Sequence, residues 1–256
     1  MSAHETIAAE QDAWGSVAHL AAEYETIAAA AQHDRWVSLL SDSGLTDEQA
    51  KAVVNSEAFG PLIGELRRAE AYGFDLQRLI PRVVASRAFD DALDIAAVIA
   101  GRFATVVAQH TRAGARARRS GHLVAGLIPR ATGPMEAEMR RGLVEREQLL
   151  EARASAVLDA AIQSRDAWVT ALGPPPRGSA AAAWRSRACT VAAYRDRYGM
   201  ISARPLGSTP ESTAQAFDAA RARIALDEAR NIARTHSIEK QSARTRSGPS
   251  PAGIQL

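Results

Sequence analysis

The sequence has one cysteine, few aromatic residues and no long apolar run, and each shortage excludes a class of protein. Cys189 has no partner for an internal disulfide, so we expect a reduced, cytoplasmic protein. Aromatic residues make up only 5% of the 256 residues, which argues against a β-sandwich or barrel. No run of about 18 apolar residues and no charged-plus-apolar leader is present, so we predict neither membrane insertion nor secretion through a signal peptide.

Charge is distributed unevenly, although the formal net charge is only +2. Residues 1–50 hold one arginine against nine acidic residues, whereas residues 101–150 hold nine arginines against four acidic residues. No acidic residue lies between Asp94 and Glu136. The basic residues of that stretch are Arg102, Arg112, Arg116, Arg118, Arg119 and Arg130. Such a stretch can bind a polyanion such as DNA, form a solvated face, or pair with the acidic residues of positions 1–50, called the acidic head below. The sequence leaves all three open.

Alanine supplies about a fifth of the chain, and apolar residues recur at helical spacing through most of it. The pattern predicts a long acidic helix over residues 1–42, a helical domain over residues 43–236 and a disordered, basic tail over residues 237–256. We therefore expect an all-α protein, an elongated multi-helix bundle with long helical hairpins.

Capping residues and helix breakers predict the boundaries of individual helices. Thr46 opens a helix as part of a capping box, and Asp75 caps a segment that Pro81 should interrupt. Asp90 and Asp91 are expected to open the next helix. The face that this helix buries should carry Leu93, Ala97, Ala100 and Ala104.

The strongest helical pattern runs from Pro134 to Leu172, which corresponds to on the order of 55 Å if the helix is continuous. Gly173-Pro174-Pro175-Pro176 then stops it. We predict a helix from about Ser179 to Tyr198 and a last one that starts at Thr209-Pro210-Glu211 and ends near Thr235. Residues 114–133 are glycine-rich and predict a loop.

The motifs of common enzyme classes are absent. The sequence has no Walker A loop, no GxGxxG after a strand and no GxSxG, so we predict no catalytic residue and no cofactor. The six histidines form no HxxxH or HxH pair, so we predict no metal site. His19 and Glu23 share a helix face but lack further ligands.

One segment, from Trp184 to Gly199, mixes aromatic residues with arginines. Its aromatic residues are Trp184, Tyr194 and Tyr198, and its arginines are Arg185, Arg187, Arg195 and Arg197. Aromatic rings interleaved with arginines can stack on bases and neutralise phosphates. The alternative is that the rings pack on the long helix while the arginines pair with Asp196 and neighbouring acids.

Several short stretches follow one another in a characteristic order between about Gly44 and Arg230. They are ELRRAE at 65–70, Asp75-Leu76 through Leu79-Ile80-Pro81, DALDIAAV at 91–98, LVAGLIPRATGP at 123–134, EMRRGLVEREQLLEA at 138–152, LGPPP at 172–176, TVAAYRDRYG at 190–199, RPLG at 204–207 and DAARAR at 218–223. In this order and spacing the chain resembles the C-terminal region of actinobacterial conjugative relaxases, the TraA/TrwC-like transfer proteins of the MobF class.

The resemblance implies a relaxase domain and a helicase domain ahead of this region in the family. The tyrosine and three-histidine metal site of the relaxase and the Walker motifs of the helicase match no position here, so no catalytic residue is carried over. We therefore expect a non-catalytic helical module that binds single-stranded DNA or the conjugation and secretion machinery. Its basic tail, with Arg244 and Arg246, would by analogy recruit it to a secretion channel.

The candidate DNA surface consists of Arg112, Arg116, Arg118 and Arg119, with Arg185, Arg187, Arg195 and Arg197 as a second set. The alternative is a structural protein with no DNA contact, which forms homo-oligomers through the long helices at 1–40 and 134–172.

Overall fold

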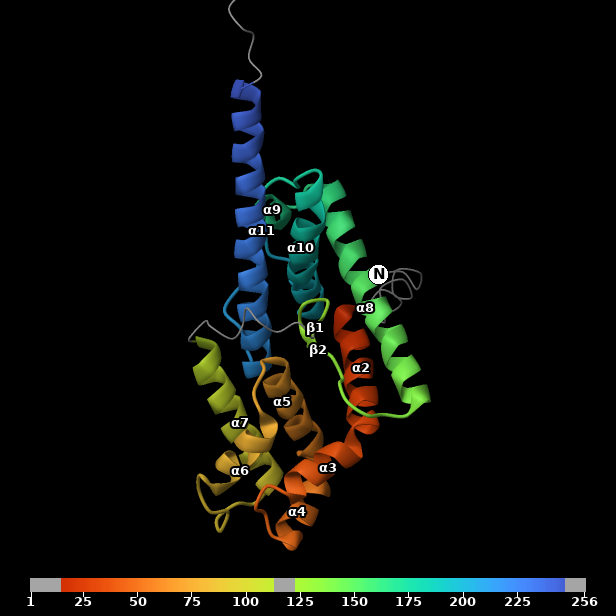
Figure 1. Cartoon of the computed structure of the whole chain (residues 1–256), viewed down its shortest axis with the longest axis vertical. Coiled ribbons are helices and arrows are strands. Elements are labelled where there is room, and N and C mark those ends of the chain that lie inside the picture. Colours follow the sequence, from red (N-terminus) through yellow and green to blue (C-terminus); the bar gives the residue numbers. More distant parts are fainter. Residues whose placement is uncertain (1–14, 113–122, 247–256) are drawn as a thin grey trace, which may run out of the picture.

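The protein folds almost entirely into helices. The computed structural model describes residues 15–112 and 123–246, which form ten helices and one two-stranded hairpin. The predicted all-α fold is confirmed, and Figure 1 shows its elongated outline. The helices are α2 (Val17–Ala31), α3 (His33–Ser41), α4 (Asp47–Val54), α5 (Phe59–Ala71), α6 (Leu76–Ala85), α7 (Ile95–Arg112), α8 (Ala137–Ser164), α9 (Ala167–Thr170), α10 (Ser179–Arg197) and α11 (Thr213–Arg246), and the antiparallel strands are β1 (Leu123–Val124) and β2 (Ile128–Pro129).

Two hydrophobic cores hold the helices together. The first is enclosed by α2, α8, α9, α10, α11 and the hairpin, and it contains Tyr24 and Leu150. The second is enclosed by α3 to α7, at the opposite end of the molecule from the free end of α11, and it contains Trp36 and Phe103 (Figure 1). Phe217, in the first turns of α11, packs into the second core and so links the two. Burial of large apolar side chains, worth about 1.5–3 kcal/mol each, is the main stabilising contribution in both cores.

The long helix predicted over residues 1–40 is divided in its described part. Gln32 leaves the helical conformation (φ −115°, ψ 11°), so that α2 ends at Ala31 and α3 begins at His33. The buried Gln32 amide donates a hydrogen bond to the carbonyl of Thr132, which holds the bend. α2 contributes to the first core and α3 to the second, so the chain passes from one core to the other near Gln32. Residues 1–14 of the predicted helix lie outside the described residues.

Helix starts in the second core follow the capping chemistry of the sequence. Thr46 and Gln49 form the predicted capping box at the start of α4. Asp75 accepts a hydrogen bond from the backbone N–H of Arg78 and caps α6 as predicted. The predicted interruption at Pro81 is wrong, because α6 continues through it to Ala85. Burial of α6 side chains on both sides of the proline outweighs the missing backbone hydrogen bond.

The start of α7 differs from the prediction. Asp94, and not Asp90 or Asp91, accepts the backbone N–H of Ala97, and the hydroxyl of Ser56 fixes the Asp94 carboxylate at 2.6 Å. The helix therefore begins later and buries a face one residue out of phase with the predicted one. That face carries Ala96, Ile99, Phe103 and Val107, whereas Leu93 is fully exposed.

The helix predicted from Pro134 to Leu172 is shorter than expected. α8 spans 28 residues, on the order of 42 Å, and ends where Arg165 adopts a left-handed backbone (φ 56°, ψ 42°). The turn lets α9 fold back and bury Trp168 in the first core. A continuous helix would carry Trp168 away from that core, which explains why the break is favoured.

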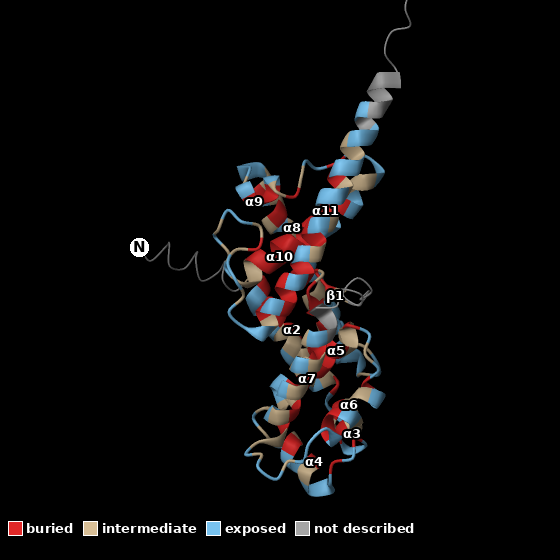
Figure 2. Ribbon diagram, turned by 90° about the vertical axis from the view of Figure 1, so that its left-hand side faces the viewer, coloured by how far each residue is buried: buried red, intermediate tan, exposed pale blue. Residues whose placement is uncertain are grey.

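The last two helices pair as a hairpin around the first core. α10 has the predicted bounds within one residue, whereas α11 begins at Thr213 and passes the predicted end at Thr235 to reach Arg246. The predicted disorder is therefore wrong for residues 237–246, and residues 247–256 lie outside the described part. The backbone N–H of Arg177, in the loop before α10, donates to the imidazole Nε2 of His236 at 3.3 Å. This hydrogen bond attaches α11 to that loop. Beyond this contact Ile238, Glu239 and Gln241 are exposed, and Figure 2 shows buried residues of α11 where it runs beside α8 and α10.

Candidate functional site

A groove of about 580 Å³ lies between α8, α10, α11 and the hairpin. Its lining includes Arg185 and Arg187 from the sequence-predicted set, together with Glu151, Cys189 and Glu228. Of the α10 residues that line it, Cys189 and Thr190 are buried, whereas Arg185 and Arg187 keep 43% and 45% of their side chains exposed and form the rim of the groove. Because the groove contains predicted site residues, it is the candidate site.

The hairpin is fixed against the wall of this groove. Gly126 has φ 72°, and a β-carbon at that position would collide with the side chain of Thr190, so the close approach requires glycine. The backbone N–H of Ala125 donates to the Glu151 carboxylate at 2.7 Å. These contacts hold Leu123, the first residue of β1, at the edge of the groove.

Arg185 and Arg187 lie at the rim in exposed ion pairs. Arg185 makes two hydrogen bonds of 2.7 Å to Asp159, with the two side chains 43% and 48% exposed, and this pairing lowers the pKa of Asp159. Arg187 pairs with Glu228 in a similarly exposed position. Exposed pairs contribute only about 0.2–1 kcal/mol, so both guanidinium groups can exchange a carboxylate for a phosphate at low cost.

Arg195 and Arg197 do not belong to this surface. Arg195 is only 6% exposed and donates hydrogen bonds to backbone carbonyls of residues 200–205. Arg197 lies between Glu25, at 3.0 Å, and Asp218, at 3.5 Å. The predicted second set of arginines is therefore divided into two rim residues and two that hold the fold, and Arg195 and Arg197 are withdrawn from the candidate DNA surface.

Of the three aromatic residues of this segment, Trp184 and Tyr194 are buried and Tyr198, which caps the end of α10, is half-buried. Trp184 and Tyr194 are in the first core, and the rings of Tyr194 and Tyr198 lie 5.1 Å apart. Burial raises the pKa of both tyrosine hydroxyls. The Trp184 and Tyr194 rings therefore pack inside the protein, as the alternative interpretation of the segment proposed, and the half-buried Tyr198 is held by the hydrogen bond from its hydroxyl to Asp218.

Two arginines of the stretch between Asp94 and Glu136, which contains no acidic residue, also bind groups within the protein. Arg102 donates to the carbonyl of Val83 at 3.1 Å and stacks on Phe89, and Arg130 pairs with Glu147 at 3.2 Å. Arg112 is the last residue of α7, and its side chain lies outside the described part, as do Arg116, Arg118 and Arg119 altogether. Their contact with DNA stays a prediction.

Part of the acidic head pairs with the basic half of the chain. Glu23 accepts from Arg146 at 2.6 Å, and Glu25 accepts from Arg197 at 3.0 Å. Both acids lie on α2, and their partners lie on α8 and α10. Internal pairing, one of the three interpretations of the uneven charge, therefore applies to these residues.

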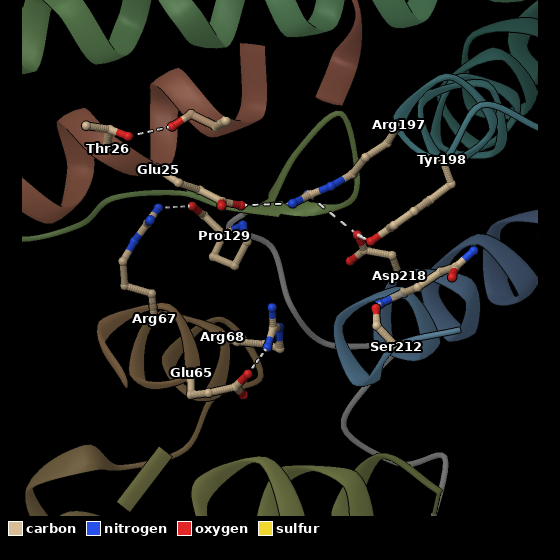
Figure 3. A network of polar contacts seen from close by, with 12 residues as sticks. Glu25, Thr26, Glu65, Arg67, Arg68, Pro129, Arg197, Tyr198, Ser212 and Asp218 are labelled. Carbon is tan, nitrogen blue, oxygen red and sulfur yellow. Dashed lines mark hydrogen bonds and ion pairs between the residues drawn. The ribbon is translucent and has the colours of Figure 1, made fainter. Parts of the chain in front are cut away.

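A cluster of charged groups fills the junction between the two cores (Figure 3). Arg67 of α5 donates to the carbonyl of Pro129 at 2.6 Å, and Tyr198 donates to Asp218 at 2.7 Å. Asp218 is 7% exposed, and burial raises the pKa of its carboxyl group although Arg197 lies beside it. The junction thus contains a carboxylate whose charge is costly to bury.

Replacing Asp218 with asparagine is expected to change how stability depends on pH. Because the folded protein raises the Asp218 pKa above its ordinary value of 3.8, the stabilisation that this group contributes is present below that value and is lost as pH rises through the raised pKa. From about pH 4 upward, the wild-type chain should therefore lose stability relative to Asp218→Asn until the folded carboxyl group is fully ionised. Urea unfolding at several pH values measures this, and a difference that stays constant with pH would contradict it.

Cys189 and the pair His19 and Glu23 are the other side chains that the sequence singled out as reactive groups or metal ligands. Cys189 is buried, and burial raises the pKa of its thiol, which favours the unreactive form. His19 and Glu23 contact each other at 3.2 Å. Within residues 15–112 and 123–246, no group of three or more His, Cys, Asp or Glu is placed to hold a metal ion. No helix in this described part is both long enough and apolar enough to cross a membrane.

The sequence patterns did not predict the buried polar contacts of Arg195 and Asp218, although the helical spacing contains a signal for each. Arg195 follows Val191 by four residues and so lies on the buried stripe of α10. Asp218 precedes Ala222 by four and Ala225 by seven, and so lies on the buried stripe of α11. A charged residue in register with an apolar stripe is evidence for a buried polar contact.

No family model, curated protein or solved structure matches the chain. The resemblance to conjugative relaxases therefore stays a prediction, and the function is argued from the groove and its charges.

Proposed function

We propose that this protein is a non-catalytic, cytoplasmic helical module that binds single-stranded DNA, alone or with transfer-machinery partners, during conjugative transfer. One observation supports the proposed DNA contact. The arginine-rich segment after α7 rejoins the described chain at Leu123, at the edge of the groove whose rim carries Arg185 and Arg187. The conjugative context comes from the resemblance.

Chain length limits how far the two sets of arginines can separate. Arg119 precedes Leu123 by four residues, so its Cα lies within about 14 Å of the groove edge even if the chain is fully extended. A single strand crossing this edge would meet the charges of the segment and of the rim together. Contacts to successive phosphates add up, because each one releases counterions.

The positions of the aromatic rings distinguish electrostatic binding of DNA from binding by base stacking. Since Trp184 and Tyr194 are buried and the half-buried Tyr198 is held against Tyr194 and Asp218, stacking on bases does not contribute in this proposal. Binding should therefore be almost entirely electrostatic, with little dependence on base composition and a steep dependence on salt.

Charge reversal at Arg116, Arg118 and Arg119 tests the proposal. The triple variant with glutamate at all three positions should lose at least about tenfold in affinity for a labelled single-stranded oligonucleotide, measured by fluorescence anisotropy. The slope of log affinity against log salt should fall by about 2, because each lost phosphate contact accounts for about 0.7. Arg185→Ala with Arg187→Ala should give a smaller loss in the same assay.

The matched control reverses three exposed arginines elsewhere. Arg82, Arg140 and Arg141 are exposed, and reversing them to glutamate changes the net charge by the same amount. This control should lose less than about threefold in affinity, because its charges lie outside the proposed contact. Equal losses in both triple variants, or no DNA binding by the wild-type chain, would overturn the proposal.

A structural role remains the alternative because of the free end of α11. This helix extends past the other helices, and Ile238 on it is 56% exposed (Figure 1). If the chain acts through self-association, light scattering should show a mass that rises with concentration while DNA affinity is absent. Replacing Ile238 with aspartate should then reduce the association.

A further inference from the structure

A second groove, of about 710 Å³, lies along the C-terminal half of α8, between that helix, α9 and the loop that follows α10. Its wall combines apolar residues, including Val157, Ala160, Trp168 and Ile201, with charged residues such as Arg153, Asp166 and Asp196. Ile201 is fully exposed although Arg195 fixes the loop that carries it. An exposed isoleucine on a fixed loop, next to the apolar part of the groove wall, indicates a surface suited to being covered.

The helix α2 enters the fold at the edge of this groove. The backbone N–H of Val17 donates to Asp196 at 2.7 Å, and Asp196, which also pairs with Arg153 at 2.8 Å, lines the groove. From there α2 runs along the first half of α8, where Glu23 pairs with Arg146. Figure 1 shows that the second half of α8 extends beyond α2. The chain preceding Val17 is therefore attached next to the part of α8 that α2 leaves uncovered.

We propose that this groove binds residues 1–14 of the same chain. Trp14 precedes Val17 by three residues, so its Cα lies within about 11 Å of Val17. Ile7 and Trp14 are seven residues apart, the spacing that places two side chains on one face of a helix. Fourteen residues in helical form measure about 21 Å, close to the roughly 17 Å of α8 between Arg153 and Ser164. Length, attachment point and apolar pattern thus agree.

One exposed arginine offers a charge contact, although the groove itself also contains Asp166 and Asp196. Residues 1–14 contain Glu5, Glu10 and Asp12 and no arginine or lysine. Arg165, at the far end of the groove, is exposed and makes no ion pair within the described part of the chain. An acidic segment lying along α8 brings a carboxylate within reach of this guanidinium.

Cross-linking in the full chain tests the placement. In a Cys189→Ala background, Ile7→Cys is combined either with Ala160→Cys in the groove or with Ala152→Cys outside it. Ala152 and Ala160 are both exposed alanines of α8, and Ala152 is nearer along α8 to Arg153, the partner of the Asp196 that binds Val17. Within one chain, a short bis-maleimide should join the thiol at position 7 to position 160 at least about tenfold faster than to position 152.

Thiol labelling gives a second measurement that needs no cross-link. A single cysteine at position 160 should react at least about tenfold more slowly than one at position 152, and Ile7→Asp with Trp14→Asp should remove the difference. Equal cross-linking rates, or equal labelling in the absence of the aspartates, would overturn the proposal. Cross-links between chains in place of those within one chain would assign the groove to a second copy and would also overturn it.

Discussion

Replacing Arg195 with alanine is expected to lower the free energy of unfolding by at least about 3 kcal/mol. The guanidinium group of Arg195 donates to four carbonyl groups of residues 200–205 at 2.7 to 3.2 Å. It also lies 5.0 Å from the centre of the Trp168 ring. Hydrogen bonds to a charged donor contribute about 1.5–3 kcal/mol each, and the alanine variant leaves several of the acceptors without a partner. Chemical denaturation followed by circular dichroism measures the loss.

Two further variants separate this role from a general effect of charge. Arg195→Lys keeps the charge but cannot reach four carbonyl groups with a planar fork, so it should lose more than half as much stability as the alanine variant. Arg204→Ala removes an exposed arginine from the same loop and should change stability by less than about 0.5 kcal/mol. A loss below about 1 kcal/mol for Arg195→Ala would show that water replaces the guanidinium group without difficulty.

The sequence predicts helices well here because alanine-rich amphipathic segments leave few alternatives. The start of α4 at Thr46 and the extent of α10 follow directly from caps, glycine and periodicity. Errors arise where tertiary contacts override these local signals. The bend at Gln32 depends on Thr132, a hundred residues away, and α6 tolerates Pro81 because its apolar side chains are buried in the second core.

The candidate site was predictable only in part, for a related reason. Helical spacing shows which arginines share a face, but not which acid from another helix faces them. Arg185 stays at the surface with Asp159, whereas Arg197 is drawn inward between Glu25 and Asp218, whose positions depend on how α2 and α11 pack. The grooves themselves arise from the packing of elements far apart in the chain, which no local pattern contains.

Replacing Trp36 with alanine is expected to cost about 3–5 kcal/mol, the usual loss when a fully buried large aromatic side chain is removed. Trp36 is completely buried in the second core, and the guanidinium group of Arg35 lies 4.4 Å from its ring. Trp36→Phe keeps most of the apolar contact and removes an indole N–H that has no hydrogen-bond partner, so it should lose less than half as much.

The same variant tests whether the two cores unfold together. The junction between them is largely polar, and polar interfaces couple domains more weakly than apolar ones. We expect Trp36→Ala to unfold the second core at lower urea than the first. With Trp14→Phe added, the remaining Trp168 and Trp184 report the first core by fluorescence, while circular dichroism reports both cores. Adding Leu150→Ala, in the first core, to that variant should move its fluorescence transition to lower urea. If both probes give one coincident transition in Trp36→Ala, Phe217 and the charged junction couple the cores into a single cooperative unit.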